Sequence, residues 1–292
     1  MGKISKALSK LGVEKGPSVI KADRAELKKT SFSPLKPKLK REEEQINSRP
    51  QPVIIESEAK KTWDERLRIA IEEHPAIAES FRRLRAKILH PVDKESIQSI
   101  LVTSADLGEG KSFVAANLGV ILAQSMERHA MVVDCDLRRP SLAGLFGLDN
   151  RQGLVNHLRE GTDLSLLIRK TGLDGLSIIP AGPVPGNPSE LLGSDKMAVM
   201  VNEIVNRYHD RMVILDSPPA QAASETAVLA QHVDKVVVVV RWGGPGREQV
   251  KKLVESIGKD KILGVVFNAF EMTLLDAKLQ GEGYYKYYSE GY

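Results

Sequence analysis

The chain has 292 residues, of which 42% are hydrophobic and 27% are charged, enough for one sizeable α/β domain with extensions. Its longest unbroken aliphatic run, residues 236–240, falls far short of the roughly 18 residues of a membrane span, and the N-terminus lacks an apolar signal-peptide core. A single cysteine excludes an internal disulfide framework, and six scattered histidines show no zinc-site spacing. We therefore expect a cytoplasmic chain without a membrane span of its own.

Positive charge is concentrated near the N-terminus. Residues 1–61 hold 15 Lys and Arg against 8 Asp and Glu, whereas the remainder holds 27 against 30. The body of the chain is thus slightly acidic, which argues against a nucleic-acid-binding domain. A membrane surface or an acidic partner is the expected target of the basic extension.

The first 62 residues predict two segments. Within residues 1–12, apolar side chains share one helical face with lysines around it, which indicates a short basic amphipathic helix for a membrane or a partner, or else a weakly ordered terminus. Residues 13–62 are rich in Lys, Glu, Pro and Ser without apolar periodicity, which is typical of a disordered linker. Order is expected to resume near Trp63, with a catalytic body over residues 63–280 and a tail over residues 281–292.

The body predicts alternating helices and strands. Residues 76–88 form the first expected helix, with Ile77, Phe81, Leu84 and Ile88 as its apolar stripe. Six short, β-branched and apolar runs follow as strands, at residues 99–103, 130–133, 176–179, 212–215, 235–240 and 262–267. Because helical stretches separate them, they predict a parallel sheet with helices on both faces and binding sites at the carboxyl ends of the strands.

A phosphate-binding loop follows the first predicted strand. Residues 105–112 read A-D-L-G-E-G-K-S, the pattern G-x-x-x-x-G-K-[ST] with Ala105 in place of the first glycine. Lys111 is expected to reach the β and γ phosphates of ATP and Ser112 to offer its hydroxyl to Mg²⁺. The candidate nucleotide-binding residues here are Gly108, Glu109, Gly110, Lys111, Ser112 and Phe113.

Three aspartates end two other predicted strands. Asp134 and Asp136 point the same way from an extended chain, and Asp216 ends the apolar run of the fourth strand. Each feature alone is common in turns and caps, but together with the phosphate loop they predict a phosphoryl-transfer site. Arg138 and Arg139 come next to the first pair and either contact the acceptor segment or a phosphate, or cap a helix.

Five of the six tyrosines lie in the last nine residues, and they are Tyr284, Tyr285, Tyr287, Tyr288 and Tyr292. Average usage would place about 0.2 tyrosine in such a window, at roughly 2% of residues. The cluster therefore predicts either an aromatic docking segment or a set of phosphate acceptors.

On the phosphate loop, the two aspartate strand ends and this tyrosine cluster, the sequence resembles the bacterial tyrosine kinase family, autokinases of exopolysaccharide and capsule synthesis. The resemblance covers roughly residues 75–292 and includes the motif E-x-x-R-x-x-R at Glu79, Arg82 and Arg85, and residues 186–192 (G-N-P-S-E-L-L). It implies a P-loop NTPase fold of the MinD/ParA-like superfamily, and the N-terminal extension looks most like the stand-alone, exosortase-associated type.

The resemblance also implies roles for individual residues. Lys111, Asp134, Asp136 and Asp216 are the expected catalytic residues, with Ser112, Asp136 and Asp216 at the metal and Asp134 as the base, although Asp134 and Asp136 cannot be separated by sequence. Asn268 occupies the position that contacts adenine in relatives. The acceptors would be the tyrosines of a neighbouring subunit in a ring assembled through Glu79, Arg82 and Arg85.

Implied partners are a transmembrane polysaccharide co-polymerase or chain-length adaptor as activator and a protein tyrosine phosphatase, with the chain peripheral to the cell membrane. Two other functions stay open. A MinD/ParA-type ATPase switch would have a signature lysine where this chain has Asp106. A nucleotide-binding scaffold without catalysis would fit two departures from the family pattern, Glu225 in place of Asp and Ala143 in place of His.

Overall fold

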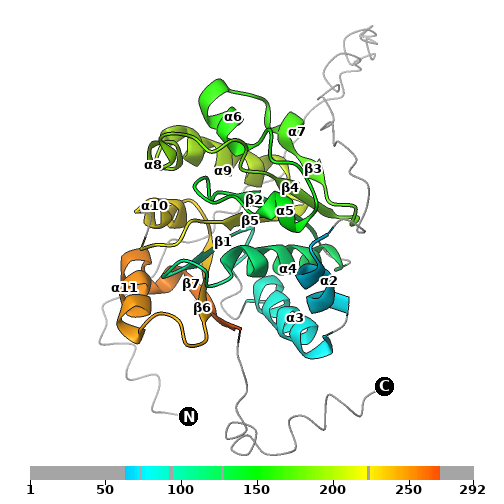
Figure 1. Ribbon diagram of the computed structural model, residues 1–292, viewed down its shortest axis with the longest axis vertical. Helices are drawn as coiled ribbons and strands as arrows, with labels where there is room; N and C mark the ends of the chain where they lie inside the picture. Colours follow the sequence, from blue (N-terminus) through cyan, green and yellow to red (C-terminus); the bar gives the residue numbers. More distant parts are fainter. Residues whose placement is uncertain (1–62, 73, 92–94, 126–127, 222–223, 270–292) are drawn as a thin grey trace, which may run out of the picture. The chain divides into compact units, whose positions relative to one another are not determined.

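The computed structural model describes residues 63–269 except 73, 92–94, 126–127 and 222–223. Within this range a seven-stranded sheet has the order β3-β4-β2-β5-β1-β6-β7 (Figure 1). Its strands are β1 (Ser99–Ser104), β2 (His129–Asp134), β3 (Arg169–Lys170), β4 (Leu176–Ile179), β5 (Arg211–Asp216), β6 (Lys235–Arg241) and β7 (Ile262–Asn268). All neighbouring strands pair in parallel except β3, which is antiparallel to β4.

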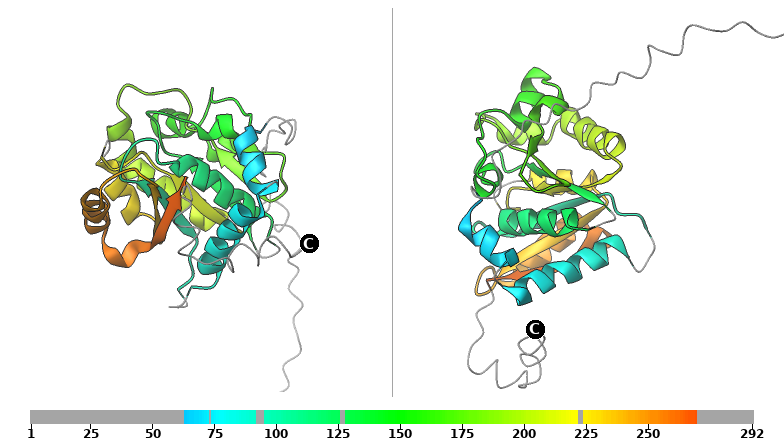
Figure 2. Two further views of the ribbon diagram at one scale, coloured as in Figure 1. Left: turned by 60° about the horizontal axis from the view of Figure 1, so that its bottom comes forward. Right: turned by 90° about the vertical axis from the view of Figure 1, so that its right-hand side faces the viewer.

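Helices cover both faces of this sheet (Figure 2). The first face carries α2 (Glu65–Glu72), α3 (Pro75–Leu89), α4 (Lys111–Ala123) and α5 (Leu142–Leu145). The second face carries α6 (Leu154–Glu160), α7 (Leu164–Leu167), α8 (Pro188–Leu192), α9 (Asp195–Arg207), α10 (Glu225–Gln231) and α11 (Arg247–Ile257). A short 3₁₀ helix, η2 (Lys259–Lys261), precedes β7. Two apolar cores result, one on each face, because the central strands are buried on both sides.

Helix α4 lies at the centre of the first core. Ten of its thirteen residues are buried, since it packs on the sheet with one side while α2 and α3 cover the other. Trp63, which precedes α2, attaches the start of this helix to the rest of the domain. Its Nε1 donates to the Thr171 carbonyl at 2.8 Å, and its ring packs edge to face on Phe146 with the centroids 5.2 Å apart. The helix that follows the phosphate loop is therefore packed between the sheet and the outer helices α2 and α3.

The six predicted strands and the first predicted helix are confirmed, with every end within one residue of the prediction. The two-residue strand β3 was not predicted, because so short a segment carries no periodic signal. Ile77 was wrongly placed in the buried stripe of α3: it is 40% exposed, and Ala78 is buried instead. Within the described residues, no helix is both long and apolar enough to cross a membrane.

Candidate active site

The phosphate loop joins β1 to α4, and both of its glycines have left-handed backbones. Gly108 has φ +73° and Gly110 has φ +88°, a region that side chains with a Cβ rarely adopt. Gly110 is also the N-cap of α4, so no side chain caps the first turn. The N–H groups of that turn are consequently available to an anion, as phosphate binding requires.

The Glu109 carboxylate is buried and accepts two backbone hydrogen bonds. The residue is only 2% exposed, and its carboxylate accepts the Asp106 N–H at 2.6 Å and the Arg241 N–H, at the end of β6, at 3.1 Å. Glu109 would therefore contribute to nucleotide binding through its backbone. Its side chain makes one charge-assisted hydrogen bond within the phosphate loop and a second one that links the loop to β6.

Asn268, at the end of β7, packs against the same loop. Its Nδ2 donates to the Glu109 carbonyl at 2.8 Å, and a Cβ on Gly110 would overlap its amide group. Arg241 adds a longer contact of 3.4 Å from Nη1 to the Gly108 carbonyl. The loop is therefore held by the ends of both β6 and β7, in addition to its attachment to β1 and α4.

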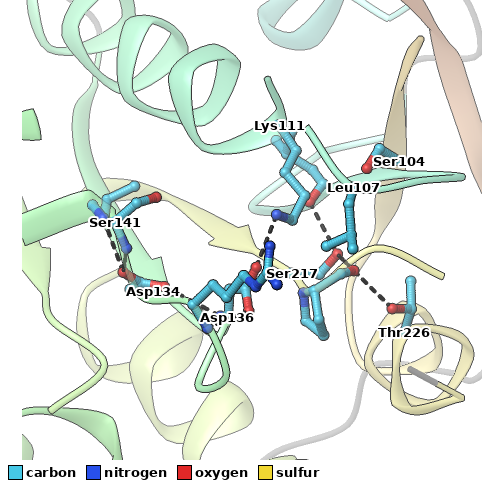
Figure 3. Close-up of polar contacts among 12 residues, drawn as sticks. Ser104, Leu107, Lys111, Asp134, Asp136, Ser141, Ser217 and Thr226 are labelled. Carbon is cyan, nitrogen blue, oxygen red and sulfur yellow. Dashed lines mark hydrogen bonds and ion pairs between the residues drawn. The ribbon is translucent and has the colours of Figure 1, made fainter. Parts of the chain in front are cut away.

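Lys111 and Asp136 face each other at the carboxyl edge of the sheet (Figure 3). The Lys111 Nζ lies 2.8 Å from the Asp136 Oδ2, and the two side chains are 11% and 3% exposed. The second oxygen of Asp136 accepts the Arg139 N–H at 3.1 Å. The Lys111 ammonium thus has the Asp136 carboxylate as its counter-ion within the chain. A bound phosphate can take the place of this carboxylate.

Asp134 organises the turn after β2. It is fully buried, and it accepts the N–H groups of Asp136 at 3.1 Å, Ser141 at 3.1 Å and Leu142 at 3.0 Å. Burial, and after it the charge of the neighbouring Asp216, raises the pKa of Asp134 well above its ordinary value. The carboxylate orients both the start of α5 and the backbone that carries Asp136.

Asp216 lies opposite Asp134 in the pairing of β5 with β2. Its side chain is completely buried, and neither carboxylate oxygen has a donor in hydrogen-bond geometry among the described residues. Burial raises its pKa from 3.8 to about 7, although the positive charge of Lys111 and, after it, the nearby Ser112 hydroxyl act in the opposite direction. An unpaired buried carboxylate is costly, so a ligand with positive charge is expected at this point.

The oxygen atoms at this edge fit Mg²⁺, which prefers a few carboxylates together with substrate phosphates. Asp136 and the unpaired Asp216 supply carboxylates, and Ser112 occupies the second residue of α4. The described part of the chain contains no cluster of three or more His, Cys, Asp and Glu side chains suited to a metal. The ion would accordingly depend on phosphate oxygens to complete its coordination.

The structure separates the other predicted site residues. Glu79 on α3 forms ion pairs with Arg82 at 3.2 Å and with Arg83 at 3.6 Å. Arg85 instead donates to the Ile121 carbonyl of α4 at 3.0 Å, within the same chain. Phe113, half-buried in the first turn of α4, accepts a hydrogen bond from Asn117 through its carbonyl. The helix at residues 1–12, the linker and all five tail tyrosines lie outside the described residues.

Sequence reasoning missed one contributor to this edge and named another without giving it a role. Arg241 holds the loop, and Ser189 of α8 accepts a hydrogen bond from Arg138 at 2.6 Å. Glu225, noted only as a departure from a pattern, lies 3.4 Å from the same arginine. Arg241 is the last residue of β6, directly after its apolar run. Because the strand was predicted to be parallel, the position of Arg241 at the carboxyl edge of the sheet could have been predicted as well. Ser189 belongs to the motif at residues 186–192, which the resemblance had indicated without a role for the serine.

Comparisons with known proteins agree with this geometry. Residues 100–281 match the family of CobQ/CobB/MinD/ParA nucleotide binding domains. The tyrosine-protein kinase YwqD of Bacillus subtilis (strain 168) is 33% identical over 210 residues, which cover 71% of this chain and 86% of YwqD. The crystal structure of the chimerical protein CapA2B2 is 33% identical with a TM-score of 0.64, covering 70% of this chain and 90% of that one. The kinase domain of the Escherichia coli tyrosine kinase ETK is 28% identical with a TM-score of 0.63, covering 71% and 82%.

Proposed function

Within the CobQ/CobB/MinD/ParA nucleotide binding domains, the chain belongs to the bacterial tyrosine kinase family, and we propose that it phosphorylates its own C-terminal tyrosines in trans. It is a protein-tyrosine kinase, an enzyme that transfers the γ-phosphoryl group of ATP to a tyrosine hydroxyl. The observation that carries the proposal is the convergence of Lys111, Asp136 and the unpaired Asp216 at the N-terminus of α4. This group can hold a triphosphate beside an acceptor oxygen.

Phosphoryl transfer is largely a matter of positioning and charge neutralisation. The loop amides and the N-terminus of α4 hold the phosphates, and Lys111 exchanges Asp136 for the β and γ phosphates. Ser112, Asp136 and Asp216 would hold Mg²⁺, which would supply positive charge to neutralise the charge developing on the phosphate oxygens. Once released from Lys111, the Asp136 Oδ2 would be free to hold the metal or its water.

The acceptor phenol has an ordinary pKa of about 10 and is mostly protonated at neutral pH, so a positioned base assists its attack. Asp134 is the candidate for this role. Its three backbone donors fix its orientation, and a carboxylate has lone pairs for a further donor. Comparison of Asp134→Asn with Asp136→Asn separates the two roles. Asp134→Asn should lower kcat and retain Mg²⁺ affinity, as expected for loss of a base. Asp136→Asn should weaken Mg²⁺ affinity, as expected for loss of a metal ligand.

The kinase acts in a homo-oligomer assembled through Glu79, Arg82 and Arg85, in which each tail reaches a neighbouring site. A transmembrane chain-length adaptor activates it at the inner face of the cell membrane, a protein tyrosine phosphatase reverses the reaction, and the cycle regulates exopolysaccharide or capsule export. Each phosphate adds about −1.5 to −2 charge at neutral pH. Repulsion among several phosphates on one tail would loosen the assembly.

Mixing two full-length variants tests the proposal. A chain with all five tail tyrosines changed to phenylalanine has an intact site without acceptors, whereas Lys111→Met keeps the acceptors without the phosphate-binding lysine. With Mg²⁺ and ATP, mass spectrometry should find phosphotyrosine on the Lys111→Met chain only when both variants are present. Absence of label in the mixture and in the wild type overturns the kinase proposal.

The same experiment addresses the two other functions. ATP hydrolysis without phosphotyrosine would indicate a MinD/ParA-type switch, and neither hydrolysis nor label would indicate a scaffold. The switch is less favoured, because the position of its signature lysine holds Asp106, whose carboxylate accepts the Leu107 N–H at 2.7 Å. An acid there cannot neutralise a partner's phosphates.

A further inference from the structure

Arg138 links three segments at the rim of the site. Its Nη2 donates to the Ser189 Oγ at 2.6 Å and lies 3.4 Å from the Glu225 Oε1. Arg138 belongs to the turn after β2, Ser189 to α8, and Glu225 is the first residue of α10. The arginine side chain is 40% exposed, while that of Glu225 is only 5% exposed. The guanidinium is thus held at one corner and open to solvent elsewhere.

Glu225 is a charged anchor for this arginine. Burial raises the pKa of Glu225, but hydrogen bonds from the Ser189 hydroxyl and its own backbone N–H, together with Arg138, outweigh burial and leave the pKa below its ordinary value. The carboxylate is therefore ionised at neutral pH, and together with Ser189 it holds the guanidinium at Nη2. The planar fork of N–H donors on a guanidinium is suited to bidentate binding of a carboxylate or phosphate.

The position of Arg138 relates it to the acceptor. It lies two residues beyond Asp136, which faces Lys111, and two residues span at most about 7 Å. The next N–H, that of Arg139, returns to the Asp136 carboxylate at 3.1 Å, so the turn is tight. An extended acceptor segment with its tyrosine at the phosphate would pass Arg138 about two residues away.

We propose that Arg138, oriented by Ser189 and Glu225, binds an anionic group two residues from the acceptor tyrosine. The inference rests on the proposed kinase function and adds a specificity subsite to it. The tail has the required spacing, since Glu282 precedes Tyr284 by two residues and Glu290 follows Tyr288 by two. A phosphotyrosine at the same spacing offers the same chemistry, as between Tyr285 and Tyr287.

Peptides of residues 281–292 in which Tyr288 is the one tyrosine test this subsite, with the full-length chain lacking tail tyrosines as the enzyme. The peptides carry Glu, Gln, Lys or phosphotyrosine at position 290. With wild-type Arg138, replacing Glu by Gln should raise the peptide KM about tenfold with kcat and the ATP KM unchanged, as expected for one charge-assisted pair. Phosphotyrosine should lower the KM further if phosphate is the better ligand. Equal affinity for the Glu and phosphotyrosine peptides would assign the subsite to any single anion.

Arg138→Gln should raise the KM of the Glu peptide to that of the Gln peptide and abolish the difference between them. Arg138→Glu should reverse the preference in favour of the Lys peptide, an outcome that a merely structural role does not produce. Glu225→Gln should weaken the same discrimination, and the double variant Arg138→Gln/Glu225→Gln should be no worse than Arg138→Gln alone. Arg151→Gln, which removes an exposed arginine paired with Asp149 at 3.4 Å, is the matched control and should change nothing.

Two results overturn the inference: an Arg138→Gln variant that retains the preference for Glu, and one that loses kcat equally on all peptides. An Arg139→Gln variant that loses discrimination as fully as Arg138→Gln would also overturn it, because general positive charge would then suffice. If the wild-type site phosphorylates neither tail nor peptide, the proposed function fails. If it phosphorylates all peptides with one KM, only the subsite fails.

Discussion

Asp216→Asn is expected to stabilise the nucleotide-free protein while it removes kinase activity. Neither oxygen of this buried carboxylate has a donor in hydrogen-bond geometry among the described residues, and burial raises its pKa from 3.8 to about 7. Because the folded state binds the proton more tightly than the unfolded state, ionisation of Asp216 opposes folding. The cost is absent below pH 3.8, grows between pH 3.8 and about 7, and is complete above pH 7.

The magnitude follows from the shift of the pKa. A displacement of about 3 pH units at about 1.36 kcal/mol each gives about 4 kcal/mol at pH 8 and under about 2 kcal/mol at pH 5. The asparagine amide stays unpaired and costs about 1–3 kcal/mol in turn. We therefore expect Asp216→Asn to raise the free energy of unfolding by about 1–3 kcal/mol at pH 8 and not at pH 5. Each kcal/mol corresponds to about 2–4 °C in Tm.

Thermal and urea unfolding in EDTA at both pH values measure this gain. Asp174→Asn, at an exposed position, is the control and should be neutral. Added Mg²⁺ and ADP should stabilise the wild type more than Asp216→Asn, as expected when a functional group is kept at a cost in stability. A variant that is less stable than wild type at pH 8, or one equally stabilised at pH 5 and pH 8, would refute the reasoning.

Two further predictions concern the loop and the outer helices. Gly110→Ala should lower ADP affinity at least about tenfold more than Gly108→Ala, as measured by calorimetric titration. Both substitutions strain a left-handed backbone, but only a Cβ at Gly110 would overlap the Asn268 side chain. Equal losses of affinity would exclude the steric explanation. Trp63→Phe should reduce the free energy of unfolding by about 1–3 kcal/mol, since the Thr171 carbonyl loses its buried donor, and an unchanged urea midpoint would contradict this role.

The positions of the phosphate loop and of the three aspartates could be predicted because strand ends are encoded locally. Apolar β-branched runs mark the strands, and parallel pairing brings their carboxyl ends to one edge, so Lys111, Asp134, Asp136 and Asp216 were expected together. The roles of Asp134 and Asp136 were not separable. Both are aspartates on the same face of one extended segment. Only their contacts distinguish them: Asp134 accepts three backbone N–H groups, whereas Asp136 pairs with Lys111.

By itself, the sequence determined six of the seven strands, the helix over residues 76–88, the position of the candidate phosphate loop and the acids that end two strands, since these depend on residues close together in the chain. The tertiary structure alone decided that Asp216 is unpaired, that Glu109 turns inward to Arg241, and that Arg138 meets Glu225 87 residues away. The physical reason is that hydrogen-bond partners and burial depend on how loops from separate strands pack. No local pattern records which donor reaches which acceptor across the edge of a sheet.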